Sequence, residues 1–174
     1  MLISNATGCS SIWGGPAATS PYTVNKEGRG PAWANSLFED NAEHGLGVYL
    51  GQKKIRDDVK PEVEYIAQNA HSDEIRQAAK DYLDTYNDGN ANQEPAKRLV
   101  SLLEAKACDG GMCEHARAVL DKKDYLNKKS MWIFGGDGWA YDIGFGGVDH
   151  VLATGEDVNI FVFNTEVYSN TGGQ

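Results

Sequence analysis

Polar side chains follow two apolar runs near the end of the sequence, and their types suit a site for a metal and phosphate. Asp137 lies between two glycines in "GGDGW", directly after the run "SMWIFGG". The second run, "VNIFVFN", passes into "NTEVYSNTGGQ". Magnesium takes oxygen ligands in an octahedron and is commonly held by few protein groups together with phosphates. We therefore predict a magnesium diphosphate site from Asp137 and the polar residues Asn164, Thr165, Glu166, Ser169, Asn170 and Thr171.

The glycines on either side of Asp137 support this interpretation. A carboxylate between glycines at a strand end is expected to be exposed, and the glycines let the backbone come near a bulky ligand. A helix that starts at this point favours an anion such as phosphate. A carboxylate beside a phosphate is repulsive unless a cation lies between them. The alternative is that Gly136–Gly138 is only a turn, but two polar clusters at neighbouring strand ends favour a metal site.

The two apolar runs are expected to be strands that position these clusters. With a helix between them, they predict a βαβ unit and a parallel sheet, in which ligands bind beyond the carboxyl ends of the strands. The first residues, "MLIS", predict a further short strand. A loop rich in Gly, Ser, Thr and Pro follows, to about Pro31, and long loops of this kind are more often functional than idle.

The middle of the sequence is charged and predicted to be helical. Pro61 is expected near a helix start and Ser72 at a helix N-cap, and apolar residues recur with a helical period. The predicted fold class is therefore α/β, with a mostly parallel sheet, helices and a helical insertion at about 55–129. All 174 residues are assigned to a single domain. The expected helices lie within 36–59, 60–70, 72–89, 92–111 and 112–129.

Composition excludes several classes of function. The net charge of −9 argues against a nucleic-acid partner, which needs a basic face, and against an anionic membrane surface. No basic and then apolar leader opens the sequence, and the apolar runs are shorter than a membrane helix of about 20 residues. Three cysteines make no disulfide framework, so a cytoplasmic location is expected.

Three long segments resemble one enzyme family. The motifs "GDGWAYDIGFGG" and "NIFVFNTEVYSNTGGQ", together with the N-terminal "NATGCSSIWGG", resemble the thiamine-diphosphate-binding domain of pyruvate:ferredoxin (flavodoxin) oxidoreductases. The order of the motifs is the same, and the helical middle resembles the family least. Other thiamine-diphosphate enzymes carry Asn-Asn a few dozen residues after Gly-Asp-Gly. In this sequence Thr165 follows Asn164, which is the form seen in the pyruvate:ferredoxin branch.

The resemblance implies roles for individual residues. Asp137, Thr165 and the Val167 carbonyl would be the magnesium ligands. Asn170 would lie on the reactive side of the cofactor, as the catalytic residue of this segment. Gly136 and Gly138 would let the diphosphate approach. The full set of expected cofactor-binding residues is Gly136, Asp137, Gly138, Trp139, Asn164, Thr165, Val167 and Asn170.

The resemblance also implies an iron–sulfur cluster. Cys9, in "ATGCSS", would be one of four ligands of a 4Fe–4S cluster, for which thiolates are the usual ligands. The other three ligands of the family have no counterpart in this sequence. Cys108 and Cys113, spaced as C-x4-C, fall outside the family motifs and are expected to be plain thiols.

The family reaction is the oxidative decarboxylation of pyruvate with coenzyme A, which gives acetyl-CoA, CO2 and reduced ferredoxin or flavodoxin in electron transport. The resemblance implies that this chain is a fragment of such an oxidoreductase and binds the magnesium diphosphate of thiamine diphosphate. The fragment alone is expected to be inactive. It is also expected to form homo-oligomers, because exposed strand edges invite self-association.

Two alternatives stay open. The first is another 2-oxoacid:ferredoxin oxidoreductase, which uses 2-oxoglutarate, a branched-chain 2-oxoacid or indolepyruvate. The N-terminal loop resembles the pyruvate branch best. The second alternative is a non-catalytic module that serves assembly only. A dinucleotide-binding module is disfavoured, because no G-x-G-x-x-G motif opens a helix directly after a strand.

Overall fold

The computed structural model describes residues 1–10, 24–37, 39–106 and 113–173. Their contacts divide them into two units, one formed by residues 1–50 and 130–174 and the other by residues 51–129. The helix α2 (Asn41–Asn69) begins in the first unit and continues into the second. Among the described residues, no helix combines the length and the apolar character needed to cross a membrane.

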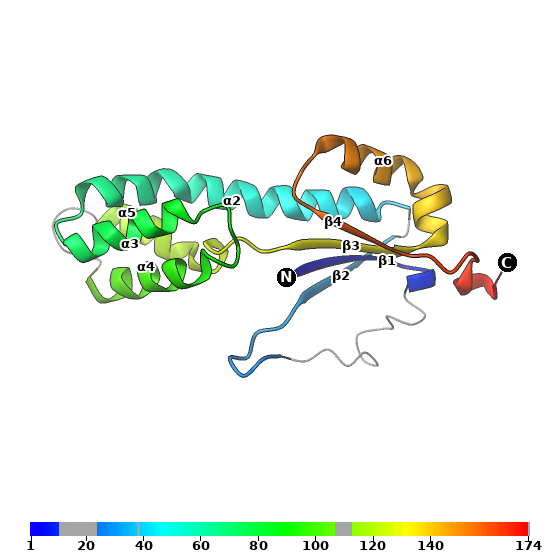
Figure 1. Ribbon diagram of the computed structural model, residues 1–174, viewed down its shortest axis with the longest axis horizontal. Helices are drawn as coiled ribbons and strands as arrows, with labels where there is room; N and C mark the ends of the chain where they lie inside the picture. Colours follow the sequence, from blue (N-terminus) through cyan, green and yellow to red (C-terminus); the bar gives the residue numbers. More distant parts are fainter. Residues whose placement is uncertain (11–23, 38, 107–112, 174) are drawn as a thin grey trace. The chain divides into compact units, whose positions relative to one another are not determined.

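The first unit contains a four-stranded parallel sheet in the order β2-β1-β3-β4 (Figure 1). Its strands are β1 (Leu2–Ala6), β2 (Ala32–Ser36), β3 (Met131–Gly136) and β4 (Asn159–Phe163). All three strand pairs are parallel. The predicted α/β class with a mostly parallel sheet is therefore confirmed. Strand β2 was not predicted, because "AWANS" carries almost no apolar alternation.

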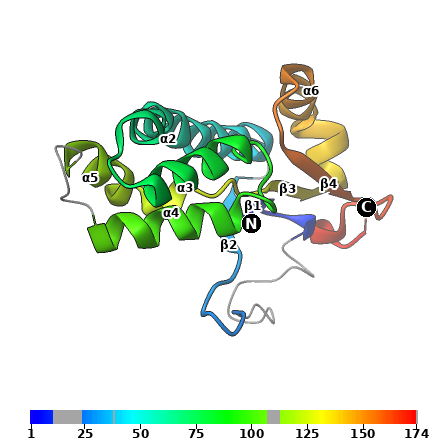
Figure 2. The same ribbon diagram turned by 60° about the vertical axis from the view of Figure 1, so that its left-hand side comes forward.

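The strands β3 and β4 are joined by two helical segments. The π-helix η2 (Trp139–Ile143) starts three residues after the last residue of β3 and leads into α6 (Phe145–Thr154). Helix α6 ends at Thr154, and its C-cap is Gly155, which has a left-handed φ of 65°; glycine is common at this position because it has no Cβ. Figure 2 shows β4 running from α6 to the C-terminal segment. This is the predicted βαβ unit.

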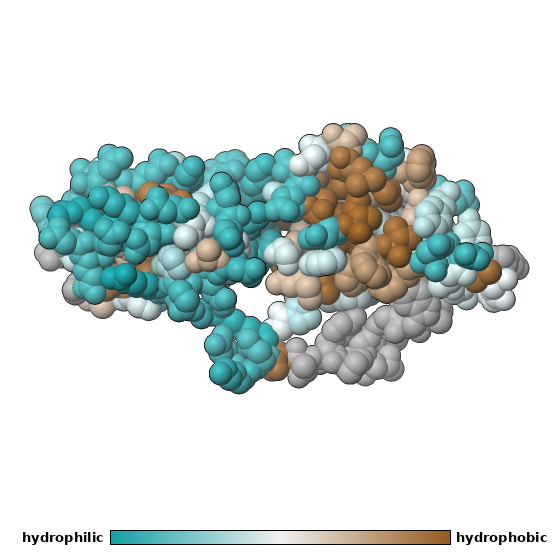
Figure 3. Space-filling view, viewed as in Figure 1, coloured by the Kyte–Doolittle hydropathy of each residue, from teal (hydrophilic) through white to brown (hydrophobic). Residues whose placement is uncertain are grey.

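One face of the sheet is covered by α2 and α6. Ala42 of α2 and Val148 and Val151 of α6 are buried in one apolar cluster with Met131 and Ile133 of β3. The opposite face carries aromatic rings, with neighbouring centroids 4.8–6.1 Å apart. These rings belong to Trp33, Trp132, Phe134, Phe161 and Phe163. Figure 3 shows apolar surface gathered over β4 and α6. Phe161 of β4 is 46% exposed.

The second unit is a helical bundle. It contains the second half of α2 with α3 (Asp73–Asp84), α4 (Gln93–Lys106), α5 (Cys113–Asp121) and the short η1 (Lys123–Tyr125). The prediction that a helix begins near Pro61 is wrong, because Pro61 lies inside α2. Proline removes one backbone donor and disfavours helix interiors, and the packing of this long helix outweighs that cost. Ser72 occupies the N-cap position of α3 but makes no capping hydrogen bond through its side chain.

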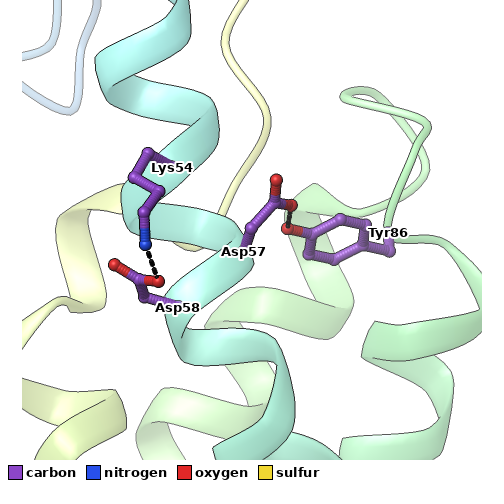
Figure 4. Close-up of polar contacts among 4 residues, drawn as sticks. All are labelled: Lys54, Asp57, Asp58 and Tyr86. Carbon is purple, nitrogen blue, oxygen red and sulfur yellow. Dashed lines mark hydrogen bonds and ion pairs between the residues drawn. The ribbon is translucent and has the colours of Figure 1, made fainter.

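A buried arginine links α2 by hydrogen bonds to two other segments of the helical bundle. Arg56 is 7% exposed and donates hydrogen bonds to the carbonyls of Leu126 and Tyr86. Its guanidinium lies 4.1 Å from the centroid of the Tyr86 ring. The Tyr86 hydroxyl donates to Asp57 at 2.8 Å, whereas the nearby pair of Lys54 and Asp58 is exposed (Figure 4). Burial is the main reason why the pKa of Tyr86 lies above its ordinary value.

Candidate metal and cofactor site

The carboxyl ends of β3 and β4 place Asp137 beside Thr165. Gly136, the last residue of β3, pairs with Phe163, the last residue of β4. Asp137 follows Gly136 directly, and Thr165 lies two residues beyond Phe163. The parallel pairing therefore brings together two polar residues that are 28 positions apart. This is the edge at which ligands of parallel α/β sheets bind.

The Asp137 carboxylate accepts several hydrogen bonds from the loop after β4. The backbone N–H of Thr165 donates to both carboxylate oxygens at 3.1 Å, and the N–H of Glu166 donates to Oδ1 at 2.9 Å. The Thr165 hydroxyl lies 2.7 Å from Oδ2. The carboxylate thus shapes the loop as well as offering oxygen ligands.

Asp137 is buried, and the expectation that it is exposed is wrong. The residue is 6% exposed because the loop after β4 folds over its carboxylate through the hydrogen bonds just described. Burial, the largest single influence, raises the pKa of Asp137. The hydrogen bonds from the Thr165 hydroxyl and from the N–H groups of Thr165 and Glu166 outweigh it, so that the pKa lies below its ordinary value. A lowered pKa keeps the carboxylate charged, as a metal ligand must be.

Three oxygen atoms converge at this loop. The Thr165 hydroxyl lies 2.7 Å from Asp137 Oδ2 and 3.0 Å from the Val167 carbonyl oxygen. Neighbouring ligands of octahedral magnesium are separated by roughly 2.8–3.0 Å, because Mg–O distances are about 2.0–2.1 Å. The observed oxygen spacings therefore fit two adjacent edges of such an octahedron.

The three oxygens share too few protons to satisfy one another. The Thr165 hydroxyl carries one proton, yet Asp137 Oδ2 and the Val167 carbonyl are both acceptors within hydrogen-bond distance of it. One of these contacts therefore places two oxygens together without a proton between them. A cation would accept lone pairs from all three oxygens, so the donor set fits a hard metal ion.

The loop that presents these oxygens is strained at one residue. Glu166 has a φ of 63°, and it is the one non-glycine residue of the described chain with a positive φ. A residue of this kind is uncommon in the left-handed region and persists only where the surroundings hold it. Here the Glu166 N–H is held by Asp137. The turn at Glu166 allows the Val167 carbonyl to approach the Thr165 hydroxyl.

A pocket of about 240 Å³ adjoins this loop. Cys9, Trp139, Tyr168 and Asn170 line it, together with backbone around Gly136 and Gly138. A shallower groove beside it is lined by Asp137, Asn164, Glu166 and Val167, among others. Among the described lining residues of both hollows, none is a lysine or arginine. A diphosphate bound here would therefore need a metal cation to neutralise it.

The two glycines of the Gly-Asp-Gly motif have close neighbours within the fold. A Cβ on Gly136 would lie 2.5 Å from Cys9 Cβ, and a Cβ on Gly138 would lie 2.8 Å from Tyr168 Cε1. Both glycines are thus required by packing, and their contact with a diphosphate stays a prediction. Trp139 is 2% exposed and packs against Gly135 and Gly144. Its Nε1 has no hydrogen-bond partner among the described residues.

Two features of the site were missed at the sequence level. The first is Tyr168, whose hydroxyl donates to Asp142 of η2; this bond raises the pKa of Tyr168. The second is a buried polar network below the strand ends. Asn41 Oδ1 accepts hydrogen bonds from the hydroxyls of Ser4 and Ser36 at 2.6 and 2.8 Å, and Asn41 Nδ2 donates to the Phe134 carbonyl at 2.8 Å. No local pattern signals contacts between such distant residues.

The described thiols do not fit an iron–sulfur cluster by themselves. Cys9 is a free, partly buried thiol on the pocket wall, and a cluster needs four such ligands. Cys108 and the side chain of Cys113 lie outside the described residues, as does the loop of residues 11–23. Within the described ranges, no group of three or more His, Cys, Asp and Glu side chains could hold a metal. The candidate magnesium site instead uses one carboxylate, one hydroxyl and one carbonyl.

Comparison with known proteins supports the resemblance found in the motifs. The chain is 54% identical over 174 residues to pyruvate-flavodoxin oxidoreductase of Klebsiella pneumoniae and 50% identical over 176 residues to pyruvate:ferredoxin oxidoreductase of Moorella thermoacetica. It is 42% identical over 206 residues to pyruvate dehydrogenase (NADP+) of Cryptosporidium parvum. All of this chain is aligned in each comparison. No protein-family model matches the sequence.

The match is to part of each relative. The chain spans about 15% of the length of the first two relatives and 11% of the third. Because the identity extends over the whole chain, the predicted resemblance is confirmed. The chain is thus related along its full length to a segment of the pyruvate-flavodoxin and pyruvate:ferredoxin oxidoreductases.

Proposed function

We propose that this chain is the magnesium diphosphate-binding segment of a pyruvate:ferredoxin or pyruvate:flavodoxin oxidoreductase. The observation that carries the proposal is the convergence of Asp137, Thr165 and the Val167 carbonyl at the carboxyl ends of β3 and β4. The identity with relatives named for pyruvate and for flavodoxin or ferredoxin supports the same reaction. The whole reaction would convert pyruvate and coenzyme A into acetyl-CoA and CO2, and the two electrons released would reduce ferredoxin or flavodoxin.

Each residue of the site has a task in this proposal. Asp137, Thr165 and the Val167 carbonyl would hold magnesium, which would neutralise the diphosphate at a surface that lacks basic side chains among its described lining residues. Asn170, on the pocket wall, would donate a hydrogen bond near the reacting centre. Trp139 closes the floor of the pocket and excludes water, since it is almost fully buried.

Thiamine diphosphate, when bound, supplies the nucleophilic carbon and the electron sink for decarboxylation of a 2-oxo acid. The pocket of about 240 Å³ is smaller than the roughly 300–1,000 Å³ of typical cofactor pockets. This segment therefore forms one wall of the site, and polypeptide outside it completes the rest. Cys9 would provide one ligand to a 4Fe–4S cluster whose remaining ligands also lie elsewhere.

The electron acceptor is not determined by this segment. Relatives named for flavodoxin, for ferredoxin and for NADP+ all align with the entire chain at 42–54% identity. Because the identity is similar whichever electron acceptor the relative is named for, we expect this segment to serve the reaction with pyruvate that these enzymes have in common. All these names specify pyruvate, which favours pyruvate over other 2-oxoacids as the substrate.

Association with further polypeptide is part of the proposal. Parallel sheets are normally covered on both faces, whereas the aromatic face of this sheet leaves Phe161 46% exposed. The isolated chain is therefore expected to self-associate. It is also expected to be inactive, because the rest of the site lies in other polypeptide.

A segment exchange tests the proposed function. The matching segment of the Klebsiella pneumoniae enzyme is replaced by this chain, and pyruvate- and coenzyme A-dependent reduction of flavodoxin is measured. We expect activity in the hybrid and its loss in the same hybrid with Asp137→Asn. A hybrid that is active with and without Asp137→Asn would contradict the proposal.

A further inference from the structure

The Val167 carbonyl needs support from outside its own residue. Val167 is 36% exposed, so packing against its neighbours holds this residue only weakly. The preceding residue, Glu166, has an uncommon left-handed φ of 63°. A carbonyl in such a loop keeps one orientation only if the chain is fixed on both sides of it. Asp137 fixes the N-terminal side through the N–H groups of Thr165 and Glu166.

Tyr168 fixes the C-terminal side through its side chain. Its ring packs over Gly138, where an added Cβ would lie 2.8 Å from Cε1. Its hydroxyl donates a hydrogen bond to the Asp142 carboxylate. Asp142 belongs to η2, the helical segment that directly follows the Gly-Asp-Gly motif. The side chain thus bridges the loop after β4 to the segment after β3.

The Tyr168 backbone also supports the turn that carries Asn170. The Tyr168 carbonyl accepts hydrogen bonds from the N–H groups of Thr171 and Gly173 at 3.2 and 3.0 Å, and from the Thr171 hydroxyl at 3.2 Å. These bonds close the short helix η3 (Ser169–Thr171) around Asn170. One residue therefore joins the Val167 carbonyl on one side to Asn170 on the other.

We propose that Tyr168 is a positioning residue, which uses its bond to Asp142 to hold both the Val167 carbonyl for the metal and the Asn170 turn for the pocket. This inference rests on the proposed function of the site. Neither Tyr168 nor Asp142 is among the metal ligands or cofactor-binding residues expected from the motifs. Both residues also line the pocket of about 240 Å³.

Four variants of the full chain test the inference. Tyr168→Phe keeps the ring over Gly138 and removes the hydroxyl. Asp142→Ala removes the acceptor, whereas Asp142→Asn restores one through its amide oxygen. Tyr65→Phe is the matched control, because Tyr65 is 42% exposed and belongs to the helical unit.

Two readouts are measured for each variant. Amide hydrogen exchange of Thr171 and Gly173, without metal, reports the turn at Tyr168. Mn²⁺ binding in the presence of thiamine diphosphate, followed by electron paramagnetic resonance, reports the carbonyl ligand. We expect Tyr168→Phe and Asp142→Ala to accelerate exchange and to weaken Mn²⁺ binding about tenfold, as for other residues that orient metal ligands. Asp142→Asn and Tyr65→Phe are expected to stay close to the original chain.

The outcomes separate this inference from the proposed function. Unchanged exchange in Tyr168→Phe would overturn the positioning role. Faster exchange with unchanged Mn²⁺ affinity would overturn its link to the metal. If neither the original chain nor the hybrid enzyme of the segment exchange binds Mn²⁺ with thiamine diphosphate, the proposed function is overturned, and the hydrogen-exchange result alone decides whether Tyr168 holds the turn.

Discussion

The Asp137 carboxylate and the Thr165 hydroxyl lie 2.7 Å apart, although 28 positions separate them in the sequence. The pairing of Gly136 with Phe163 at the ends of β3 and β4 creates this proximity. The Val167 carbonyl joins them at 3.0 Å from the hydroxyl. The close approach of these three oxygens bears on metal binding, on stability and on the response of the fold to pH.

Removal of the Thr165 hydroxyl is expected to weaken metal binding. Thr165→Val has nearly the same shape but lacks the oxygen, so we expect Mg²⁺ affinity with thiamine diphosphate to fall by about 10–100-fold, at least the loss seen for residues that only orient ligands. Thr165→Ser keeps the oxygen and is the matched control. Calorimetric titration measures the Mg²⁺ affinity of both variants. Equal affinity of the valine and serine variants would exclude the hydroxyl as a ligand.

Low pH is expected to remove the stability that Asp137 contributes. Its pKa is below the ordinary value in the folded chain, so the charged carboxylate stabilises the fold above the unfolded pKa of about 3.9. The contribution is lost as the pH falls through the lower folded pKa. Urea unfolding of the chain and of Asp137→Asn at pH 7 and at pH 3 measures this. The stability difference between the two should shrink at pH 3, and a constant difference would refute the pH linkage.

Asn41 is expected to matter for the stability of the sheet unit. It is fully buried and bonds to Ser4, Ser36 and the Phe134 carbonyl. Asn41→Ala leaves buried polar groups without partners, which costs about 1–3 kcal/mol of unfolding free energy. Urea denaturation followed by circular dichroism measures the loss. Asn90→Ala, at an exposed position, is the control and should unfold like the original chain; equal stability of both variants would argue against the network.

Arg56 is expected to be a main support of the helical unit. Arg56→Leu leaves the carbonyls of Leu126 and Tyr86 without their donors and should cost about 2–4 kcal/mol. Lys54→Leu, two positions away on α2, removes an exposed ion pair with Asp58 and should leave the denaturation midpoint unchanged. If the two variants unfold at the same urea concentration, the buried arginine has no special role.

Two glycines of α2 are expected to respond in opposite directions to alanine. A Cβ on Gly47 meets no atom within 4 Å, whereas a Cβ on Gly45 would lie 2.5 Å from Ile133 Cγ1. Gly47→Ala should stabilise the helix by about 0.5–1 kcal/mol. Gly45→Ala should destabilise the contact with β3 by about 1–3 kcal/mol. Thermal unfolding compares them, and a shift of the same sign in both would contradict the packing described.

Local sequence features predicted the elements that have a clear pattern of apolar residues. The apolar runs around Ile133 and Phe161 indicated β3 and β4, and their carboxyl ends indicated the edge where Asp137 and Thr165 meet. Strand β2 was missed because it lies at the edge of the sheet and has little apolar periodicity. Pro61 was misread as a helix start, since its local preference is outweighed by the packing of α2.

The polar contacts that shape the site could not be predicted from spacing. Asp137 was expected to be exposed, and it is buried because a loop 28 positions away donates hydrogen bonds to it. The bond from Tyr168 to Asp142 joins residues 26 positions apart. Such contacts depend on the register of β3 and β4, which the sequence pattern leaves undetermined.

The most direct test is calorimetric titration of the 174-residue chain with thiamine diphosphate, with and without Mg²⁺. Asp137→Asn is titrated beside it, because it keeps the size of the side chain and removes its charge. Our account predicts binding that requires Mg²⁺ and is lost in Asp137→Asn. Binding that is equally strong without Mg²⁺, or that is unchanged in Asp137→Asn, would contradict the assignment of this strand edge as a magnesium diphosphate site.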